Sequence, residues 1–212
     1  MGLREKMYEA GVVKNWGFFR DNYESLTIDD LVWINTKWDS VLPYQKSHSL
    51  NAMVKMFSSI TENNLKVVEL GSYRSFLGSH LIEKVSSKVA EWHGYDINHA
   101  AIEDAIIHPQ IFNHKLSKWF WEVDVSGYDI FVSSHTLEHF SFEQLKKIVE
   151  TVSICKYLVL EIPLQNNWRG FRGSHVLLTT VEEVESLISA THIKLIDCSR
   201  ERNWVVSLWR KN

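Results

Sequence analysis

The stretch Lys66–Leu81 contains the residues best suited to bind a small ligand. Val67–Leu70 is a short apolar run interrupted by Glu69, Gly71 ends the run, and a tight polar loop, SYRS, follows. From Phe76 the apolar residues recur at helical spacing. Strand, glycine turn and helix in this order open a nucleotide-type βαβ unit, in which glycine lets the backbone approach a ligand and the helix start offers unpaired N–H groups. We therefore predict a ligand-binding turn around Gly71.

Two histidines are candidates for moving a proton. His135 follows a predicted strand, and His175 lies in a polar loop at residues 164–178. A histidine titrates near neutrality and suits a general base, although a histidine that packs against the strand end explains His135 equally well. The loop around His175 also holds two arginines and two aromatic residues. These indicate an anionic, aromatic ligand about as well as they indicate a solvated loop.

The same region contains the letters H-x-x-E-H, which is an inverted zinc-protease motif. Two histidines four residues apart on a helix can share a metal ion, so His135, Glu138 and His139 are candidates for a zinc-dependent hydrolase. The context argues against it, because the motif follows a strand and a helix cap begins at Ser141. No third ligand is identifiable either, so we expect no metal site.

Length and composition predict one soluble globular domain. The chain has 212 residues, a net charge of −3 and no extended basic run, so nucleic acid is not favoured as a partner. Its two cysteines, Cys155 and Cys198, are expected to be free thiols. The start of the chain carries no apolar signal region and no long apolar run follows, so we expect a cytoplasmic protein without a membrane segment. Exposure of Trp204 and Trp209 on an edge strand would indicate a homodimer.

Alternating strand and helix patterns predict a doubly wound α/β sheet. Helices are expected from Phe76, at Ala100–Ile107, and after capping boxes at Ser141 and Thr180. The strands are expected at Val67–Leu70, Val89–Asp96, Gln110–Lys115, Tyr128–Ser133, Tyr157–Ile162, His192–Cys198 and Trp204–Trp209. The last two form a hairpin, so the sheet is expected to be mixed.

The segment before the first strand is rich in aromatic residues and shows two helix starts. Thr27–Asp30 reads as a capping box, and Ser47 precedes a helix with an apolar face. We interpret residues 1–62 as a helical cap or substrate lid, and residues 63–212 as the ligand-binding domain.

Glu69-Leu70-Gly71 at one strand end and Asp96 at the next resemble motifs I and II of the class I S-adenosylmethionine (SAM) methyltransferases. The usual pattern is acid-x-Gly-x-Gly-x-Gly, and this sequence has Tyr73 and Ser75 at the second and third glycines. Later segments also resemble the small-molecule type of this family. They are the "LEH" signature Leu137–His139, the strand YLVLEIP, and a late segment with His175 and Thr180 in matching places.

The resemblance implies a Rossmann-like fold with an antiparallel last strand, and it assigns roles around SAM. Asp96 would accept hydrogen bonds from the two ribose hydroxyls, Ile97 would flank adenine, and Glu69 would orient the Gly71 loop and the aminoacyl end. Arg74 would pair with the carboxylate of SAM, or it is a solvated surface residue. The cofactor-binding set is Glu69, Gly71, Ser72, Tyr73, Arg74, Asp96, Ile97 and Ser134, and the catalytic candidates are His135 and His175.

The function implied by the resemblance is SAM-dependent transfer of a methyl group to oxygen or nitrogen of a small molecule. The alternative is a catalytically inactive protein of the same fold that binds a partner, because two glycines of the loop are missing. Retention of Glu69, Gly71 and Asp96 argues against that alternative. The zinc-dependent hydrolase is the less favoured third reading.

Overall fold

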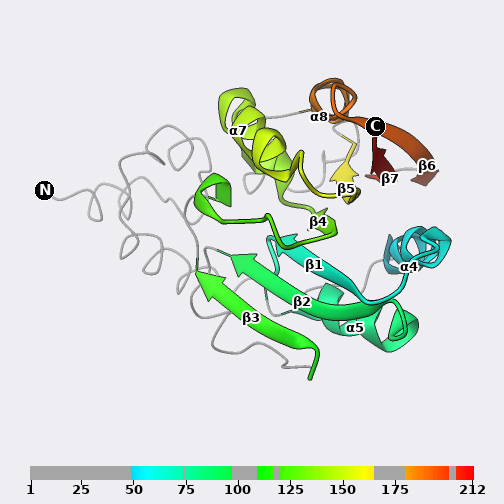
Figure 1. Cartoon of the computed structure of the whole chain (residues 1–212). Coiled ribbons are helices and arrows are strands. Elements are labelled where there is room, and N and C mark those ends of the chain that lie inside the picture. The colour runs from blue at the N-terminus through cyan, green and yellow to red at the C-terminus, as the bar shows by residue number, and fades with distance from the viewer. Residues whose placement is uncertain (1–48, 74, 97–108, 117–119, 165–179, 201–203) are drawn as a thin grey trace, which may run out of the picture.

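The computed structural model describes residues 49–73, 75–96, 109–116, 120–164, 180–200 and 204–212. Within these ranges seven strands form one sheet in the order β3-β2-β1-β4-β5-β7-β6 (Figure 1). The strands are β1 (Leu65–Leu70), β2 (Val89–Asp96), β3 (Ile111–Leu116), β4 (Ile130–Ser134), β5 (Tyr157–Pro163), β6 (His192–Arg200) and β7 (Trp204–Lys211). The helices are α4 (Ser49–Ser59), α5 (Phe76–Val85), α7 (Phe142–Val152) and α8 (Val181–Ile188), with short 3₁₀ helices η3 (Phe120–Glu122) and η4 (Leu137–His139).

The strand directions confirm the predicted doubly wound mixed sheet. Strands β3, β2, β1, β4 and β5 run parallel to one another. Strand β7 inserts between β5 and β6 and is antiparallel to both. The predicted C-terminal hairpin therefore supplies the antiparallel strand β7, whereas β6 runs in the same direction as β5.

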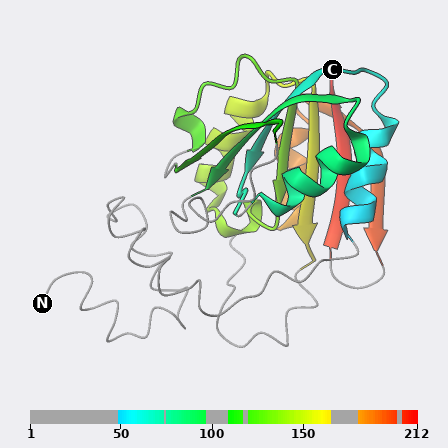
Figure 2. The same cartoon turned by 90° about the horizontal axis from the view of Figure 1, so that it is seen from below.

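Helices cover both faces of the sheet, with α4 and α5 on one face and α7 and α8 on the other (Figures 1 and 2). Successive residues of a strand point to opposite faces, so β1 contributes Val67 to the α4/α5 side and Val68 to the α7/α8 side. Both side chains are fully buried. A strand that is buried on both faces needs apolar residues at successive positions, which Val67 and Val68 provide, and the buried Glu69 is the exception in β1.

Two helix starts predicted from sequence are present as complete capping boxes. The Ser141 hydroxyl accepts from the Gln144 N–H, and the Gln144 side chain accepts from the Ser141 N–H. Thr180 and Glu183 make the same reciprocal pair at the start of α8. These pairs satisfy backbone N–H groups that the first turn of a helix leaves open.

Part of the N-terminal segment lies in the described structure. Helix α4 packs against α5 and buries Met53, Met56 and Phe57 in the core on that side of the sheet. The capping box at Thr27–Asp30 and the predicted helix at Ala100–Ile107 lie outside the described residues. The cap or lid role of residues 1–62 stays a prediction.

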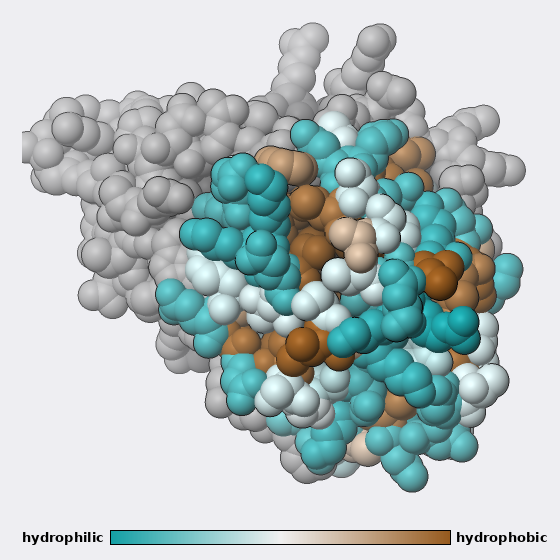
Figure 3. Space-filling model, turned by 45° about the horizontal axis from the view of Figure 1, so that its top comes forward, coloured by the Kyte–Doolittle hydropathy of each residue, from teal (hydrophilic) through white to brown (hydrophobic). Residues whose placement is uncertain are grey.

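On the face seen in Figure 3, the described surface is mostly hydrophilic, with smaller apolar areas between the hydrophilic residues. None of the helices in the described ranges has the length and apolar character that crossing a membrane requires. Trp209 is buried and β7 is an interior strand, so the condition that would have indicated a dimer is not met. Cys155 is a buried free thiol and Cys198 a partly exposed one.

Candidate functional site

The carboxyl ends of β1, β2, β4 and β5 bring the predicted site residues to one edge of the sheet. Leu70 of β1 pairs with Tyr95 of β2 on one side and with Ser133 of β4 on the other. Ser134 pairs with Glu161 of β5. The residues that follow these pairs are therefore neighbours in space, and in open α/β sheets this edge is where ligands bind.

The Gly71 loop is tied to the end of β2 by backbone hydrogen bonds. The N–H groups of Gly71 and Ser72 donate to the Tyr95 carbonyl at 2.8 and 3.2 Å. The Tyr73 N–H donates to the Asp96 carboxylate at 2.8 Å. The two sequence motifs that carry the resemblance are thus in direct contact.

Tyr73 and Ser75, which stand at the usual second and third glycines, keep a glycine-like backbone. Their φ angles are 45° and 59°, and that of Gly71 is 81°. Residues other than glycine are disfavoured in this left-handed region by roughly 1–2 kcal/mol. Tyr73 and Ser75 therefore adopt the left-handed backbone that glycine would adopt, and the turn carries backbone strain at both positions.

This strain leads to a prediction at position 73. Because alanine has a Cβ and glycine has none, we expect Tyr73→Gly to be more stable than Tyr73→Ala by about 1 kcal/mol, measured by urea unfolding. The comparison removes the tyrosine ring from both variants, so the difference reports the backbone alone. Alanine as the more stable residue would contradict the left-handed conformation.

Gly71 is required by a contact within the protein. A Cβ atom at Gly71 would lie 1.9 Å from the Thr136 hydroxyl oxygen and 2.8 Å from its Cβ. The Thr136 hydroxyl itself donates to the Ser134 carbonyl at 3.0 Å, which fixes the side chain over the glycine. The segment after β4 therefore packs directly on the turn after β1.

Glu69 is a buried carboxyl group on the α4/α5 side of the sheet. It is 1% exposed, and one of its oxygens accepts a hydrogen bond from the Trp92 indole N–H at 2.7 Å. Gly78 of α5 makes room for this indole, since a Cβ there would lie 2.8 Å from the Trp92 Nε1. Burial raises the pKa of Glu69 to about 8, against the opposing effect of the Trp92 bond and with a contribution from Asp96.

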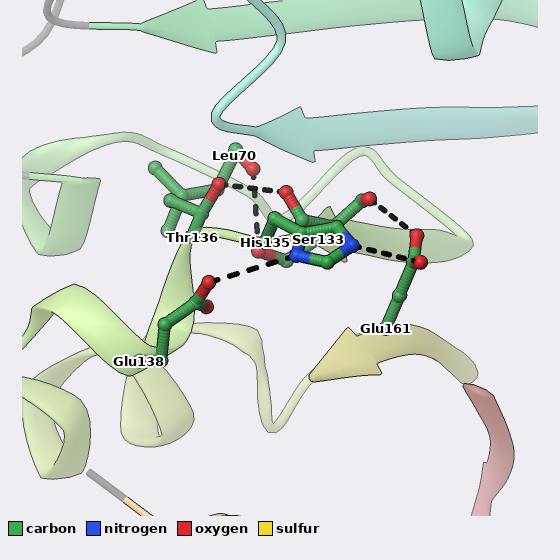
Figure 4. Close-up of polar contacts among 7 residues, drawn as sticks. Leu70, Ser133, His135, Thr136, Glu138 and Glu161 are labelled. Atoms are coloured by element: carbon green, nitrogen blue, oxygen red, sulfur yellow. Dashed lines mark hydrogen bonds and ion pairs between the residues drawn. The ribbon is translucent and has the colours of Figure 1, made fainter. Parts of the chain in front are cut away.

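His135 lies between two buried carboxyl groups (Figure 4). Its Nε2 is 2.9 Å from an oxygen of Glu161, and its Nδ1 is 3.9 Å from an oxygen of Glu138. The other Glu161 oxygen accepts from the Ser134 hydroxyl at 2.6 Å. The His135 backbone has a φ of 50°, a left-handed conformation of the kind that clusters at functional sites.

The two carboxyl groups act on the protonation of His135. Burial lowers the pKa of the imidazole, but the hydrogen bond and the charge of Glu161, together with the charge of Glu138, raise it above the usual value. Burial raises the pKa of Glu138 to about 7, although His135 and a backbone hydrogen bond oppose it. With a pKa of about 7, Glu138 can therefore exchange a proton near neutral pH.

The structure brings together all of the predicted site residues that it describes. Glu69, Gly71, Ser72, Tyr73, Asp96, Ser134 and His135 lie at the same edge of the sheet. Arg74, Ile97 and His175, as well as the arginine-containing loop, lie outside the described residues. Roles in cofactor binding and catalysis stay proposals for all of them.

The backbone does not form the helix that the zinc motif requires. His135 precedes η4, has a positive φ, and is followed by only three residues of 3₁₀ helix. Within the described ranges no three His, Cys, Asp or Glu side chains are arranged to hold a metal ion. The sequence context thus correctly indicated that residues 135–139 do not form a long helix.

Sequence reasoning missed three contacts of this site. The first is the hydrogen bond between His135 and Glu161, and the second is the packing of the Thr136 side chain against Gly71. The third is the Trp204 ring, which lies edge-on to His135 with 6.3 Å between the ring centres. A signal existed for Glu161 alone, because it is the one acidic residue in the apolar strand YLVLEIP. The other two contacts depend on strand register.

Comparison with known proteins supports the fold. No family model matches the chain, and no curated protein matches it. Among solved structures, the fold is similar to N-methyltransferase NodS from Bradyrhizobium japonicum in complex with S-adenosylhomocysteine, with a TM-score of 0.58 at 12% identity over 90% of this chain and 98% of that one. It is also similar to human N-acetylserotonin methyltransferase in complex with SAM, with a TM-score of 0.62 at 12% identity over 91% of this chain and 58% of that one.

A third similar structure is a Haloferax volcanii chain solved with the methyltransferase activator Trm112. Its TM-score is 0.61 at 10% identity, over 87% of this chain and 95% of that one. At such identities the likenesses establish the fold, which is the Rossmann-like fold of methyltransferases.

Proposed function

We propose that this chain transfers a methyl group from SAM to an oxygen or nitrogen atom of a small molecule. The observation that supports this best is the bond from the Tyr73 N–H to Asp96, which joins the Gly71 loop to the acid at the end of β2. The two motifs that resemble the SAM site thus meet at the edge where open α/β sheets usually bind ligands, in a sheet with the Rossmann-like fold of the similar methyltransferases.

The residues at this edge fit SAM by their chemistry. A carboxylate such as Asp96 offers several acceptor sites to two ribose hydroxyls, and the turn at Gly71 has its backbone held against β2. We propose that the binding set is completed by Ser72, Tyr73, Arg74, Ile97 and Ser134. Glu69 is proposed to orient the Gly71 loop. When bound, SAM supplies an activated methyl group on sulfur.

The chain's own part in the reaction is to orient the acceptor and to take its proton where the acceptor has one to lose. His135 is proposed for this step, with His175 as a second candidate. Residues 1–62 and 164–178 are proposed to cover the acceptor. A cytoplasmic location and a small-molecule acceptor belong to the same proposal.

Calorimetric titration with SAM and with S-adenosylhomocysteine, in the presence of a chelator, tests the function. We expect both to bind with dissociation constants on the order of micromolar, which corresponds to about −8 kcal/mol. Binding with the chelator present would remove a required metal from the binding step. Failure of both to bind would count against the isolated chain as an enzyme and favour a partner-binding protein of this fold, or a site that only a partner or substrate completes.

Asp96 variants test the ribose contact. Asp96→Ala is expected to weaken SAM binding by about 1.5–3 kcal/mol, because it removes charge-assisted hydrogen bonds. Asp96→Asn keeps an acceptor for the Tyr73 N–H and loses only the charge, so it separates the ribose contact from the support of the loop. Asp124→Ala, at an exposed acid outside the site, is the control. An Asp96→Ala variant that binds SAM like the wild type would show that the assignment is wrong.

A further inference from the structure

Glu161 contacts His135 in a way that decides which ring nitrogen carries the proton. The Glu161 side chain is buried, and its two oxygens accept from two different donors, His135 Nε2 at 2.9 Å and the Ser134 hydroxyl at 2.6 Å. Accepting hydrogen bonds on both oxygens favours the ionised carboxylate. An ionised carboxylate can only accept, so the proton between the two groups belongs to Nε2.

The backbone of the sheet holds this pair rigidly. Ser134 and Glu161 are partners in the parallel register of β4 and β5, and the His135 N–H donates to the Glu161 carbonyl at 3.1 Å. The positive φ of His135 then turns the chain out of the strand directly after this bond. The imidazole and the carboxylate are therefore aligned by main-chain contacts on both sides.

The second ring nitrogen, Nδ1, has a different environment. Its distance of 3.9 Å to Glu138 is beyond a hydrogen bond, and the His135 side chain is 32% exposed while both carboxyl side chains are nearly inaccessible. Among the described residues, the charged groups that face the imidazole ring are Glu161 and Glu138. The uncharged Trp204 ring packs edge-on against it. Nδ1 is thus the nitrogen left to receive a proton.

We propose that Glu161 is a positioning residue, which holds His135 as the Nε2–H tautomer and leaves Nδ1 to take the proton of the methyl acceptor. The proposal rests on the proposed function. A lone pair of the acceptor forms the bond to the methyl carbon, the electron pair of the broken carbon–sulfur bond stays on sulfur, and the acceptor's proton passes to Nδ1. The resulting imidazolium is stabilised by Glu161 and Glu138 and returns its proton to solvent.

The variant Glu161→Gln is designed to change the tautomer of His135 without changing the fold. Glutamine has the size of glutamate, and its amide NH₂ can donate to Nε2, which would force the proton onto Nδ1. In the Ser-His-Asp triad the corresponding Asp-to-Asn change leaves the geometry intact and lowers kcat by about 10⁴ through the wrong tautomer. Glu143→Gln, at an exposed glutamate on α7, is the matched control.

The first measurement is NMR of protein with ¹⁵N-labelled histidine, with His135→Gln used to assign the signal. We expect the Nε2–H tautomer at His135 in the wild type and in Glu143→Gln, and the Nδ1–H tautomer in Glu161→Gln. The pKa of His135 is expected to fall in Glu161→Gln, because the carboxylate that raises it is removed. An Nδ1–H tautomer in the wild type, or an unchanged tautomer in Glu161→Gln, would overturn the proposal.

The second measurement is the pH dependence of methyl transfer to an acceptor taken from a screen of simple amines and phenols. We expect Glu161→Gln to lower kcat by about 10²-fold or more, with KM and SAM affinity within about threefold of the wild type. A purely structural role would lower stability and leave kcat and the ascending limb of the pH profile unchanged, which would also overturn the proposal. Calorimetry distinguishes failure of the proposed function from failure of the Glu161 proposal. Absence of SAM binding in the wild type would reject the proposed function, whereas the tautomer of His135 tests the Glu161–His135 contact independently of SAM.

Discussion

Replacing Glu69 by glutamine is expected to make the protein more stable at pH 8, and to have little effect at pH 5. The Glu69 side chain is 1% exposed and its pKa is raised from 4.5 to about 8 by burial. The folded protein therefore keeps this carboxyl protonated over a pH range in which the unfolded chain releases the proton. Glutamine is neutral at every pH, and its amide oxygen can still accept from the Trp92 indole.

The direction follows from proton linkage. The stability that neutral Glu69 contributes is fully present below the unfolded pKa of 4.5, and it is lost as pH rises through the folded pKa of about 8. Since a tenfold change in an ionisation constant corresponds to about 1.4 kcal/mol, the full loss is on the order of 4–5 kcal/mol. Between pH 5 and 8 the wild type should thus lose stability relative to Glu69→Gln.

Urea unfolding of both proteins at several pH values measures this difference. Other groups also titrate in this range, among them Glu138 and His135, but they are common to both proteins and cancel in the comparison. Glu143→Gln should follow the wild type at each pH, because that side chain is exposed. Parallel curves for wild type and Glu69→Gln would mean that the Glu69 carboxyl ionises as easily in the folded protein as in the unfolded chain.

The second large effect is expected from Gly71→Ala, which should lower the free energy of unfolding by about 3 kcal/mol. The added Cβ would lie 1.9 Å from the Thr136 hydroxyl oxygen, and the residue has a φ of 81°. Overpacking of a tight contact costs about 1–3 kcal/mol, and a Cβ in the left-handed region costs roughly 1–2 kcal/mol more. For a chain of this size the melting temperature should fall by roughly 6–12 °C.

A double variant separates the two causes. Gly71→Ala combined with Thr136→Gly removes the side chain that the new Cβ would meet, so the steric part should be recovered while the strain from the positive φ remains. Gly127→Ala is the control, because nothing lies within 4 Å of a Cβ there, and its stability should stay within about 0.5 kcal/mol of the wild type. If Gly71→Ala melts like Gly127→Ala, the close contact with Thr136 does not exist in solution.

The sequence by itself determined the class of the fold and most of its described elements. Short apolar runs predicted the strands because a strand covered on both faces must be apolar at successive positions. Strand β2 has the predicted bounds, whereas β4 begins two residues later than predicted, at Ile130, because Tyr128 belongs to a turn closed by its bond to the Val125 carbonyl. Helix starts were predictable because a capping box involves residues only three positions apart.

The sequence also placed Gly71, Asp96 and His135 correctly at strand ends, each at the end of the segment predicted as a strand or within two residues of it. It did not predict that Tyr73 and Ser75 would adopt the conformation of the glycines they replace. Their local sequence favours other conformations, and the bonds of the loop to Tyr95 and Asp96 override that preference.

Only the tertiary structure decided which groups touch at the site. Glu161 lies 26 residues after His135, and Thr136 reaches Gly71 from another strand end, so neither contact follows from a local pattern. Both depend on the register in which β4 pairs with β1 and β5. Register is set by how all the buried side chains pack together, and a shift by one residue would turn each strand over. The periodicity that predicts a strand is the same in every register, and for this reason the sequence located the ends of the strands but not the partners of His135.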